Sequence, residues 1–322
     1  MSAKLRIDPY LLALFGCVLL ASLVPARGRV GTALDYVTDG VIALLFFLYG
    51  TRLSPREAWE GARHLRLQGT VLAFTFVLFP VLGLILRALL PGLLSEELYV
   101  GFLVLCALPS TVQSSIAFTS IARGNVAAAL TAASLSNLLG VVVTPMLLAL
   151  MLRRAGTTMS GEAIPKLAMQ LLLPFFLGQL SRPWLSAWVT RHKQALGYVD
   201  RGSILLVVYS AFSEGVVAGV WQRISLAQLG RLLALDAVLL ALVLILTTAI
   251  SRALRFRKED EIAAVFCGSK KSLASGLPMA SVLFSQASVG LLVVPLMLFH
   301  QLQLMACAWL SQRYARRHAA PS

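Results

Sequence analysis

The chain has 322 residues, of which 58% are hydrophobic and only 13% are charged. A soluble domain needs a surface with roughly 25–35% charged residues, so this composition excludes a chain of soluble domains and predicts an integral membrane protein. The net charge of +14 does not indicate nucleic-acid binding, because the Lys and Arg residues gather in short loops, where membrane topology explains them. The apolar stretches lack the alternation of a membrane barrel, so the expected fold class is all-α.

A membrane-spanning helix needs about 20 apolar residues, and the sequence contains ten stretches of this kind. They cover residues 10–25, 34–50, 69–90, 98–122, 126–152, 164–181, 203–221, 229–250, 261–283 and 287–309. The loops on the N-terminal side of the membrane carry most of the Lys and Arg residues. We therefore expect ten spans in the plasma or inner membrane, with both termini in the cytoplasm.

Two of these stretches are interrupted in the same way. Residues 106–115 read CALPSTVQSS and residues 267–276 read CGSKKSLASG, so each apolar helix contains a run of small or polar residues. The next spans also correspond, with GVVVTP at 140–145 and GLLVVP at 290–295. The pattern predicts two inverted five-span repeats, residues 1–155 and 156–322, whose broken helices 4 and 9 cross near the bilayer midplane.

The interruption in span 4 is the first candidate site. Unwound backbone inside a membrane is tolerated only where it lines a polar cavity or is buried in protein. A proline there removes a backbone donor, and the polar residues after it can replace lost partners, coordinate a ligand, or simply bond back to their own helix. The residues are Pro109, Ser110, Thr111, Gln113, Ser114 and Ser115.

The interruption in span 9 contains two lysines, Lys270 and Lys271, between Gly268-Ser269 and Ser272. They lie roughly 14 Å into the span, where a charge costs at least ~2.5–3.5 kcal/mol. Adjacent helical residues cannot point the same way, so at least one lysine is expected to face a cavity. A lysine here can bind an anionic solute, replace a coupling ion, carry a proton, or neutralise a carboxylate.

Two further polar features lie in the neighbouring spans. Glu214 is expected at a comparable depth in span 7, where it pairs with a lysine of span 9 or binds a cation. Asp236, in span 8, is expected closer to the outer end and within reach of water. Thr131, Ser134 and Asn137 recur every three residues in span 5, which predicts a polar stripe facing the span-4 break or polar contacts between helices.

No combination of residues indicates an enzyme. The sequence contains no HExxH motif, and its four histidines are scattered. It also lacks a glycine-rich phosphate loop, which argues against ATP-driven transport. We expect no catalytic residues and no resident cofactor.

Several segments together carry a family resemblance. The segments Cys106-Ala-Leu-Pro109-Ser110, Ile121-Ala-Arg-Gly-Asn125-Val-Ala and Thr144-Pro145 resemble the bile acid:sodium symporter superfamily. Gly268-Ser-Lys-Lys-Ser272 is similar to its divergent SBF-like branch. The resemblance covers nearly the whole chain. It implies a panel domain of spans 1, 2, 6 and 7 and a core domain of spans 3–5 and 8–10, with the solute between them beside the crossing.

The chain departs from the sodium-coupled members at the span-9 break. Those members carry glutamate just before the glycine and glutamine just after it, whereas this chain has Phe266 and Cys267 before Gly268, and Lys270 at the glutamine position. Sodium therefore loses its principal carboxylate. The remaining candidate ligands for a single Na⁺ are Ser114 and Ser115, which match the family's Ser-Asn pair, together with Ser134 and Asn137.

These observations predict a secondary transporter of a small organic anion, coupled to Na⁺, to H⁺ or to neither. Its expected partners are membrane lipid and the anionic solute. The alternative is a regulator or sensor that keeps the transporter fold without transporting, with His192-Lys193 and the loop from Arg252 to Lys258 contacting a protein or anionic lipid. The sequence leaves the solute, the direction of transport and the oligomeric state open.

Overall fold

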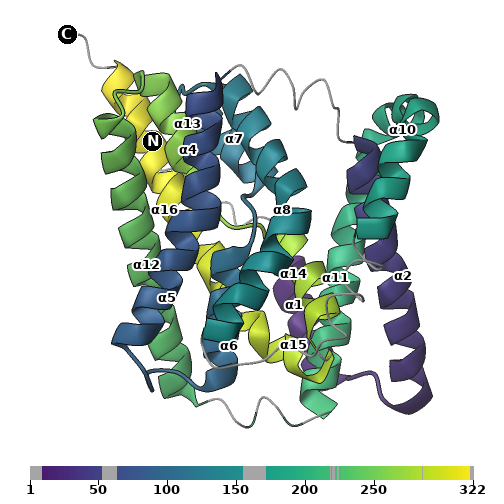
Figure 1. Cartoon of the computed structure of the whole chain (residues 1–322). Helices are drawn as coiled ribbons and strands as arrows, with labels where there is room; N and C mark the ends of the chain where they lie inside the picture. Colours follow the sequence, from purple (N-terminus) through teal and green to yellow (C-terminus); the bar gives the residue numbers. More distant parts are fainter. Residues whose placement is uncertain are drawn as a thin grey trace. The chain divides into compact units, whose positions relative to one another are not determined.

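The computed structural model describes residues 9–52, 64–154, 172–217, 219, 222, 225–284 and 286–319. These described residues form helices and no strand (Figure 1). In chain order the elements are α1 (Pro9–Leu23), α2 (Gly28–Arg52), α4 (Leu65–Ala73), the π-helix η2 (Phe74–Leu78), α5 (Phe79–Leu89), α6 (Glu96–Ala107), α7 (Val112–Ile121), α8 (Val126–Arg154), α10 (Leu173–Arg191), α11 (Lys193–Val217), α12 (Leu226–Ala253), α13 (Lys258–Gly268), α14 (Leu273–Leu283), α15 (Gln286–Leu292) and α16 (Val294–Ala319).

Six helical stretches of the described chain are long and apolar enough to cross a membrane. They are Gly28–Arg52, Leu65–Leu89, Val126–Arg153, Lys193–Val217, Leu226–Ala253 and Ser288–Arg316. The bent pair α6 and α7, which meet at 61°, adds a seventh if it counts as one span. These stretches agree with the prediction of a helical membrane protein.

The other predicted spans are divided or only partly described. The first is the 15-residue helix α1, and the predicted span 261–283 is divided between α13 and α14. The start of the predicted span 164–181 and the predicted repeat junction at residue 155 lie outside the described residues. The ten-span count and the inverted repeat therefore stay predictions.

The helices divide into two compact units. Unit 1 comprises Met1–Arg52, Pro165–Ile224 and Leu277–Leu291, and so contains α1, α2, α10 and α11. Unit 2 comprises Leu53–Ile164, Ser225–Gly276 and Leu292–Ser322, and contains both interrupted segments described below.

Within unit 1, α2 and α10 pack closely because a glycine of each helix faces the backbone of the other. A Cβ atom at Gly50 would lie 2.1 Å from the carbonyl oxygen of Phe175, and one at Gly178 would lie 2.1 Å from that of Phe47. Small residues allow this approach between membrane helices, where dispersion contacts replace the hydrophobic effect. Alanine at either position would force the two helices apart.

Within unit 2, small side chains bring α4, α8 and α13 together. A buried cluster joins alanines of α8 to alanines of α13 and to Leu67, Val71 and Phe74. The alanines involved are Ala128, Ala129, Ala132, Ala133, Ala263 and Ala264. This close packing positions the end of α13, where the second interruption begins.

Candidate functional site

Both predicted interruptions are present in unit 2. The helix α6 ends at Ala107 and α7 begins at Val112, with Leu108 and Thr111 in extended conformation between them. The helix α13 ends at Gly268 and α14 begins at Leu273. Pro109 accounts for the first break, because it cannot donate the backbone hydrogen bond that would continue the helix.

The two breaks bond directly to each other. Ser110 Oγ donates to the carbonyl oxygen of Cys267 (2.5 Å), Thr111 Oγ1 donates to that of Lys271 (2.8 Å), and Ser272 N donates to that of Pro109 (2.9 Å). Each break therefore supplies hydrogen-bond partners that the other helix has lost. The crossing is tightly closed, since Ser110 and both lysines have no exposed surface.

The helix α8 lies along the first break and bonds to it. Ser110 N donates to Ser136 Oγ (3.0 Å), Asn137 Nδ2 donates to the Ser110 carbonyl oxygen (2.6 Å), and Thr144 Oγ1 donates to that of Ala107 (2.9 Å). A Cβ atom at Gly140 would lie 2.7 Å from the ring of Pro109. Positions 136, 137, 140 and 144 share one helical face. This face of α8 packs against the first break and forms hydrogen bonds with its backbone.

The predicted stripe of span 5 is therefore corrected in part. Asn137 does face the break, but Thr131 Oγ1 bonds back to the carbonyl oxygen of Ala127 (3.0 Å). Three-residue steps drift around a helix of 3.6 residues per turn, so the three residues do not share one narrow face. The sequence reasoning missed Ser136, although a serine one position before Asn137 was a usable signal.

The Lys271 ammonium is enclosed by backbone carbonyl groups. Its Nζ donates to the carbonyl oxygens of Thr75 (2.8 Å), Cys106 (2.9 Å) and Leu108 (2.6 Å). It also lies 4.1 Å from the centre of the Phe79 ring, where a cation is attracted to the aromatic face. An ammonium group has three donors, so all of them are used.

Irregular backbone provides these carbonyl groups. Phe79 N donates to the carbonyl oxygen of Phe74, five residues earlier, so the carbonyl group of Thr75 lacks the partner that an α-helix would give it. Cys106 belongs to the last turn of α6, whose carbonyl groups have no partner within the helix. The negative end of the α6 dipole also favours a cation there.

Gln303 fixes the backbone of the same lysine. Its Oε1 accepts from Lys271 N (2.8 Å), and its Nε2 donates to the Lys271 carbonyl oxygen (3.0 Å). The side chain is fully buried. Sequence reasoning missed this residue, although Gln301 and Gln303 interrupt an apolar span and could have drawn attention to it.

Lys270 has a different environment. Its Nζ donates to Ser114 Oγ (3.2 Å), which is the one hydrogen bond that the described residues give this ammonium group. The rings of Phe118 and Phe266 lie 4.5 and 5.8 Å from it. Two of its three donors thus have no hydrogen-bond partner among the described residues, and the side chain is buried.

Three of the four predicted Na⁺ ligands form hydrogen bonds within the protein. Ser114 accepts from Lys270, and Ser115 Oγ donates to the carbonyl oxygen of Phe266 (3.1 Å). Asn137 Oδ1 accepts from Ser275 Oγ (2.8 Å), and Ser134 is partly exposed. The Lys270 ammonium group next to Ser114 would repel a second cation, which argues against Ser114 as a ligand; the Na⁺ site stays a prediction.

Among the described residues, the others predicted for the site do not form hydrogen bonds with either lysine ammonium group. Ser272 Oγ donates to Ser275 Oγ (3.1 Å), and Ser269 is buried. Gly268 packs against the Phe74 ring, where a Cβ atom would lie 2.5 Å from Cδ2. Gln113 is exposed.

Glu214 lies in unit 1, whereas both lysines lie in unit 2. The helix α11 starts at Lys193 and ends at Val217, so Glu214 lies three residues from the helix end rather than in its middle. Within unit 1 the carboxyl group of Asp35 is its neighbour, and Ser210 Oγ donates to Asp35 Oδ1 (3.3 Å). The pairing of Glu214 with a lysine of span 9, or with a cation, stays a prediction.

Asp236 is also corrected. It has no exposed surface, and both carboxyl oxygens lack a hydrogen-bond partner within the described residues. Its distance from the end of the span predicts access to water, but the side chain is buried, as are Leu235 and Leu239 of the same helix.

Comparison with known proteins identifies the family. The model of the SBF-like CPA transporter family matches residues 8–316. The chain belongs to this family. As a member of the SBF-like CPA transporter family it is classed with multi-pass membrane transporters rather than with enzymes.

Individual relatives cover nearly the whole chain. The chain is 50% identical over 311 residues to "Putative symporter YfeH" of Escherichia coli (97% of this chain, 94% of the relative). It is 55% identical over 311 residues to "Uncharacterized protein PA2026" of Pseudomonas aeruginosa (96% and 93%). It is 28% identical over 314 residues to "Sodium/bile acid cotransporter 7" of Danio rerio (94% and 92%).

In this SBF-like CPA transporter the Arg-Gly-Asn segment has a structural explanation. Arg123, two residues after the end of α7, has the left-handed conformation, with φ of 59°, and a Cβ atom at Gly124 would lie 2.5 Å from Ile262 Cγ2. Asn125 Oδ1 accepts from Ala128 N (3.0 Å), and its Nδ2 donates to Asp260 Oδ1 (2.8 Å). The segment thus caps α8 and joins it to the start of α13.

Proposed function

We propose that the protein is a secondary transporter of a small organic anion and that Lys270 is the cation that meets the solute. The observation that carries this proposal is the contrast between the two lysines: the Lys271 ammonium uses all its donors on carbonyl groups, whereas Lys270 uses one on Ser114. A buried charge in a membrane protein marks a functional position by default.

The helix geometry around Lys270 supports an anionic solute. The helices α7 and α14 both begin at the crossing, at Val112 and Leu273. Helix N-termini present free N–H groups and partial positive charge. Ser110 and Thr111 donate their hydroxyl hydrogens across the crossing, so opening the crossing would release donors toward a carboxylate or sulfonate.

We also propose the ten-span, inverted-repeat organisation, with both termini in the cytoplasm and the plasma or inner membrane as the location. In this proposal unit 1 is the panel domain and unit 2 is the core domain. The division supports it for most elements, because α1, α2, α10 and α11 fall in unit 1 and both breaks fall in unit 2. Unit 1 also includes Leu277–Leu291, which the prediction assigns to the core domain. Alternating access would expose the crossing first to one side of the membrane and then to the other.

Uptake by proteoliposomes tests the proposal. The purified chain would be reconstituted and given labelled monocarboxylates, dicarboxylates and sulfonates, each with and without a Na⁺ gradient and a pH gradient. Uptake above that of empty liposomes, abolished in Lys270→Met and unchanged in the control Lys193→Met, would support the proposal. Lys193 is a suitable control because it is an exposed lysine at the start of α11.

The result that would overturn the proposal is equally concrete. If no anion of the panel enters and the reconstituted protein is folded, the regulator alternative is favoured. If uptake occurs but Lys270→Met transports as well as the wild type, transport stands and the role of Lys270 is wrong. Dependence on either gradient would identify the coupling ion.

A further inference from the structure

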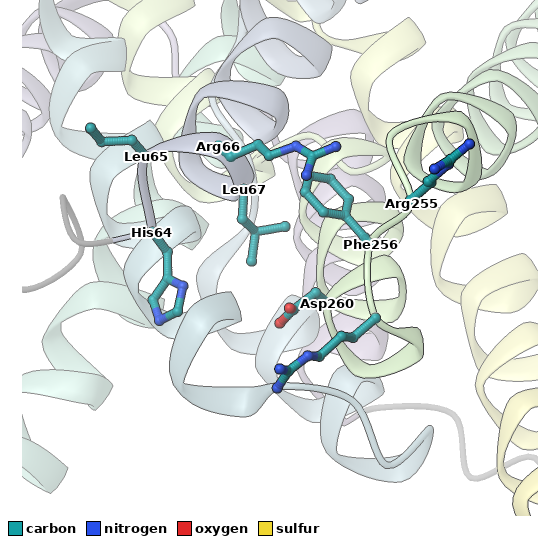
Figure 2. Close-up of a pocket in the computed structure, with 8 residues that line it drawn as sticks. His64, Leu65, Arg66, Leu67, Arg255, Phe256 and Asp260 are labelled. Atoms are coloured by element: carbon teal, nitrogen blue, oxygen red, sulfur yellow. The ribbon is translucent and has the colours of Figure 1, made fainter.

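Unit 2 contains a hollow of about 410 Å³ that none of the crossing residues lines. Figure 2 shows its walls. The start of α4 contributes His64, Leu65, Arg66 and Leu67, and the junction of α12 with α13 contributes Arg255, Phe256, Arg257 and Asp260. In Figure 1, α4 and α13 begin at the same end of the unit. The Lys and Arg distribution predicts that this end is cytoplasmic.

The basic residues around the hollow differ in how they are neutralised. Arg252 Nε and Lys258 Nζ lie 3.2 and 2.6 Å from Glu261 Oε1. Arg255 and Arg257, which lie between them in the sequence, form no ion pair with any described residue. The same stretch of chain therefore carries two neutralised cations and two that are open to an anion.

The acidic residue in the lining does not neutralise these arginines. Asp260 Oδ1 accepts a hydrogen bond from Asn125 Nδ2 (2.8 Å), and no ion pair joins it to a described arginine. The lining combines three arginines and a histidine with one aspartate. An anion entering the hollow would therefore meet a net positive lining.

Arg66 is held in position before any ligand arrives. It donates from Nη2 to the carbonyl oxygen of Leu254, and its guanidinium carbon lies 5.2 Å from the centre of the Phe256 ring. Figure 2 shows the guanidinium group beside this ring. A guanidinium group has five N–H donors, so the contact fixes Arg66 while leaving donors for a ligand.

One helix start reinforces the positive lining. The helix α4 begins at Leu65 with no acidic residue and no side-chain hydrogen bond that caps its first turn, whereas the first turn of α13 carries Glu259, Asp260 and Glu261. The first N–H groups of a helix have no partner within the helix. These groups suit an oxyanion.

We propose that this hollow binds a phosphate group, carried either by an anionic lipid headgroup or by a soluble phosphate ester. Guanidinium groups bind phosphate oxygens in a planar, bidentate geometry that an ammonium group cannot reproduce. The volume falls within the range of small-molecule sites, so the hollow can accept a phosphate with its substituent. The site is independent of solute transport at the crossing.

Calorimetric titration of the full-length protein in detergent micelles tests the proposal. The probes are dioctanoyl phosphatidic acid, glycerol 3-phosphate, inorganic phosphate and, as a zwitterionic control, dioctanoyl phosphatidylcholine. We expect at least one phosphate probe to bind and the affinity to fall as salt is added. Binding of the lipid alone identifies a headgroup site, whereas equal binding of glycerol 3-phosphate identifies a soluble ester.

Matched variants assign the binding to the hollow. Arg66→Gln and Arg257→Gln are each expected to weaken binding about tenfold, and Arg316→Gln, an exposed arginine at the end of α16, is expected to leave it unchanged. Arg66→Gln also removes the hydrogen bond to the carbonyl oxygen of Leu254. If this variant unfolds, Arg257→Gln is the deciding variant, because the Arg257 side chain has no hydrogen bond to a described residue. The proposal is overturned if no phosphate probe binds, or if both hollow variants bind like the wild type.

Discussion

Lys270 and Lys271 are adjacent in the chain, but the groups that surround their two ammonium groups differ in chemistry. Carbonyl oxygens from η2 and from the end of α6 bond to the Lys271 ammonium. Aromatic rings and a single hydroxyl group surround Lys270. The comparison shows that irregular helix geometry can stabilise a cation in a membrane protein with no carboxylate of a described residue hydrogen-bonded to it. No carbonyl group accepts from the Lys270 ammonium among the described residues, so in our proposal its two remaining donors bind the solute.

The largest expected effect comes from removing the enclosed ammonium. Lys271→Met would leave three buried carbonyl groups without a donor, so we expect the free energy of unfolding in micelles to fall by about 3–5 kcal/mol. Denaturant titration followed by circular dichroism measures this change. A variant whose free energy of unfolding lies within about 1 kcal/mol of the wild type would show that the three carbonyl groups do not need the ammonium group as a hydrogen-bond donor.

Lys270→Met is expected to act on transport instead. The loss of an ammonium donor to an anionic solute should lower uptake about ten- to a hundredfold, with the free energy of unfolding within about 1 kcal/mol of the wild type. Initial rates in proteoliposomes, compared with Lys193→Met, measure the effect. Equal stability losses in Lys270→Met and Lys271→Met would erase the distinction between the two lysines.

Gln303→Leu tests whether the backbone around Lys271 needs its own support. The variant removes two hydrogen bonds to that residue, and we expect a loss of about 1–2 kcal/mol in the free energy of unfolding. The same titration measures it. A neutral result would mean that the other hydrogen bonds of the break, from the Lys271 ammonium, Thr111 and Ser272, are sufficient to hold it.

The smallest expected effect concerns the aromatic side of Lys270. Phe118→Leu removes a cation–π contact worth about 0.5–1 kcal/mol, so we expect the KM for the solute to rise about two- to fivefold. The exposed Phe176→Leu in unit 1 serves as the control for expression and reconstitution. An unchanged KM would assign the orientation of Lys270 to Ser114 and Phe266.

The positions of the two breaks could be predicted from the sequence because each has a local chemical cause. Pro109 lacks an N–H donor, and charged residues in the middle of an apolar stretch indicate a polar environment. The apolar stretches likewise predict a helical membrane protein, because their lengths match the bilayer.

The partners of the lysines could not be predicted in the same way. The acceptors around Lys271 are main-chain carbonyl groups, which every residue has, and one of them depends on the π-turn at Phe79. Pro80, which follows Phe79, indicates irregular backbone there but not which group the carbonyl oxygen binds. The reasoning from opposite charge led instead to Glu214, a residue of unit 1 whose pairing with a lysine stays a prediction. Charge alone does not identify a partner when backbone dipoles can serve.

The tethering of the Lys271 ammonium has a consequence for energetics. A sodium ion held by carbonyl oxygens can be captured on one side of a membrane and discharged on the other, so its gradient can drive work. A positive group that is covalently part of the chain cannot leave in this way and can exchange only its proton. The position that Lys271 fills therefore cannot draw energy from a Na⁺ gradient, and any Na⁺-driven concentrating power of the carrier must originate at a different place in the molecule.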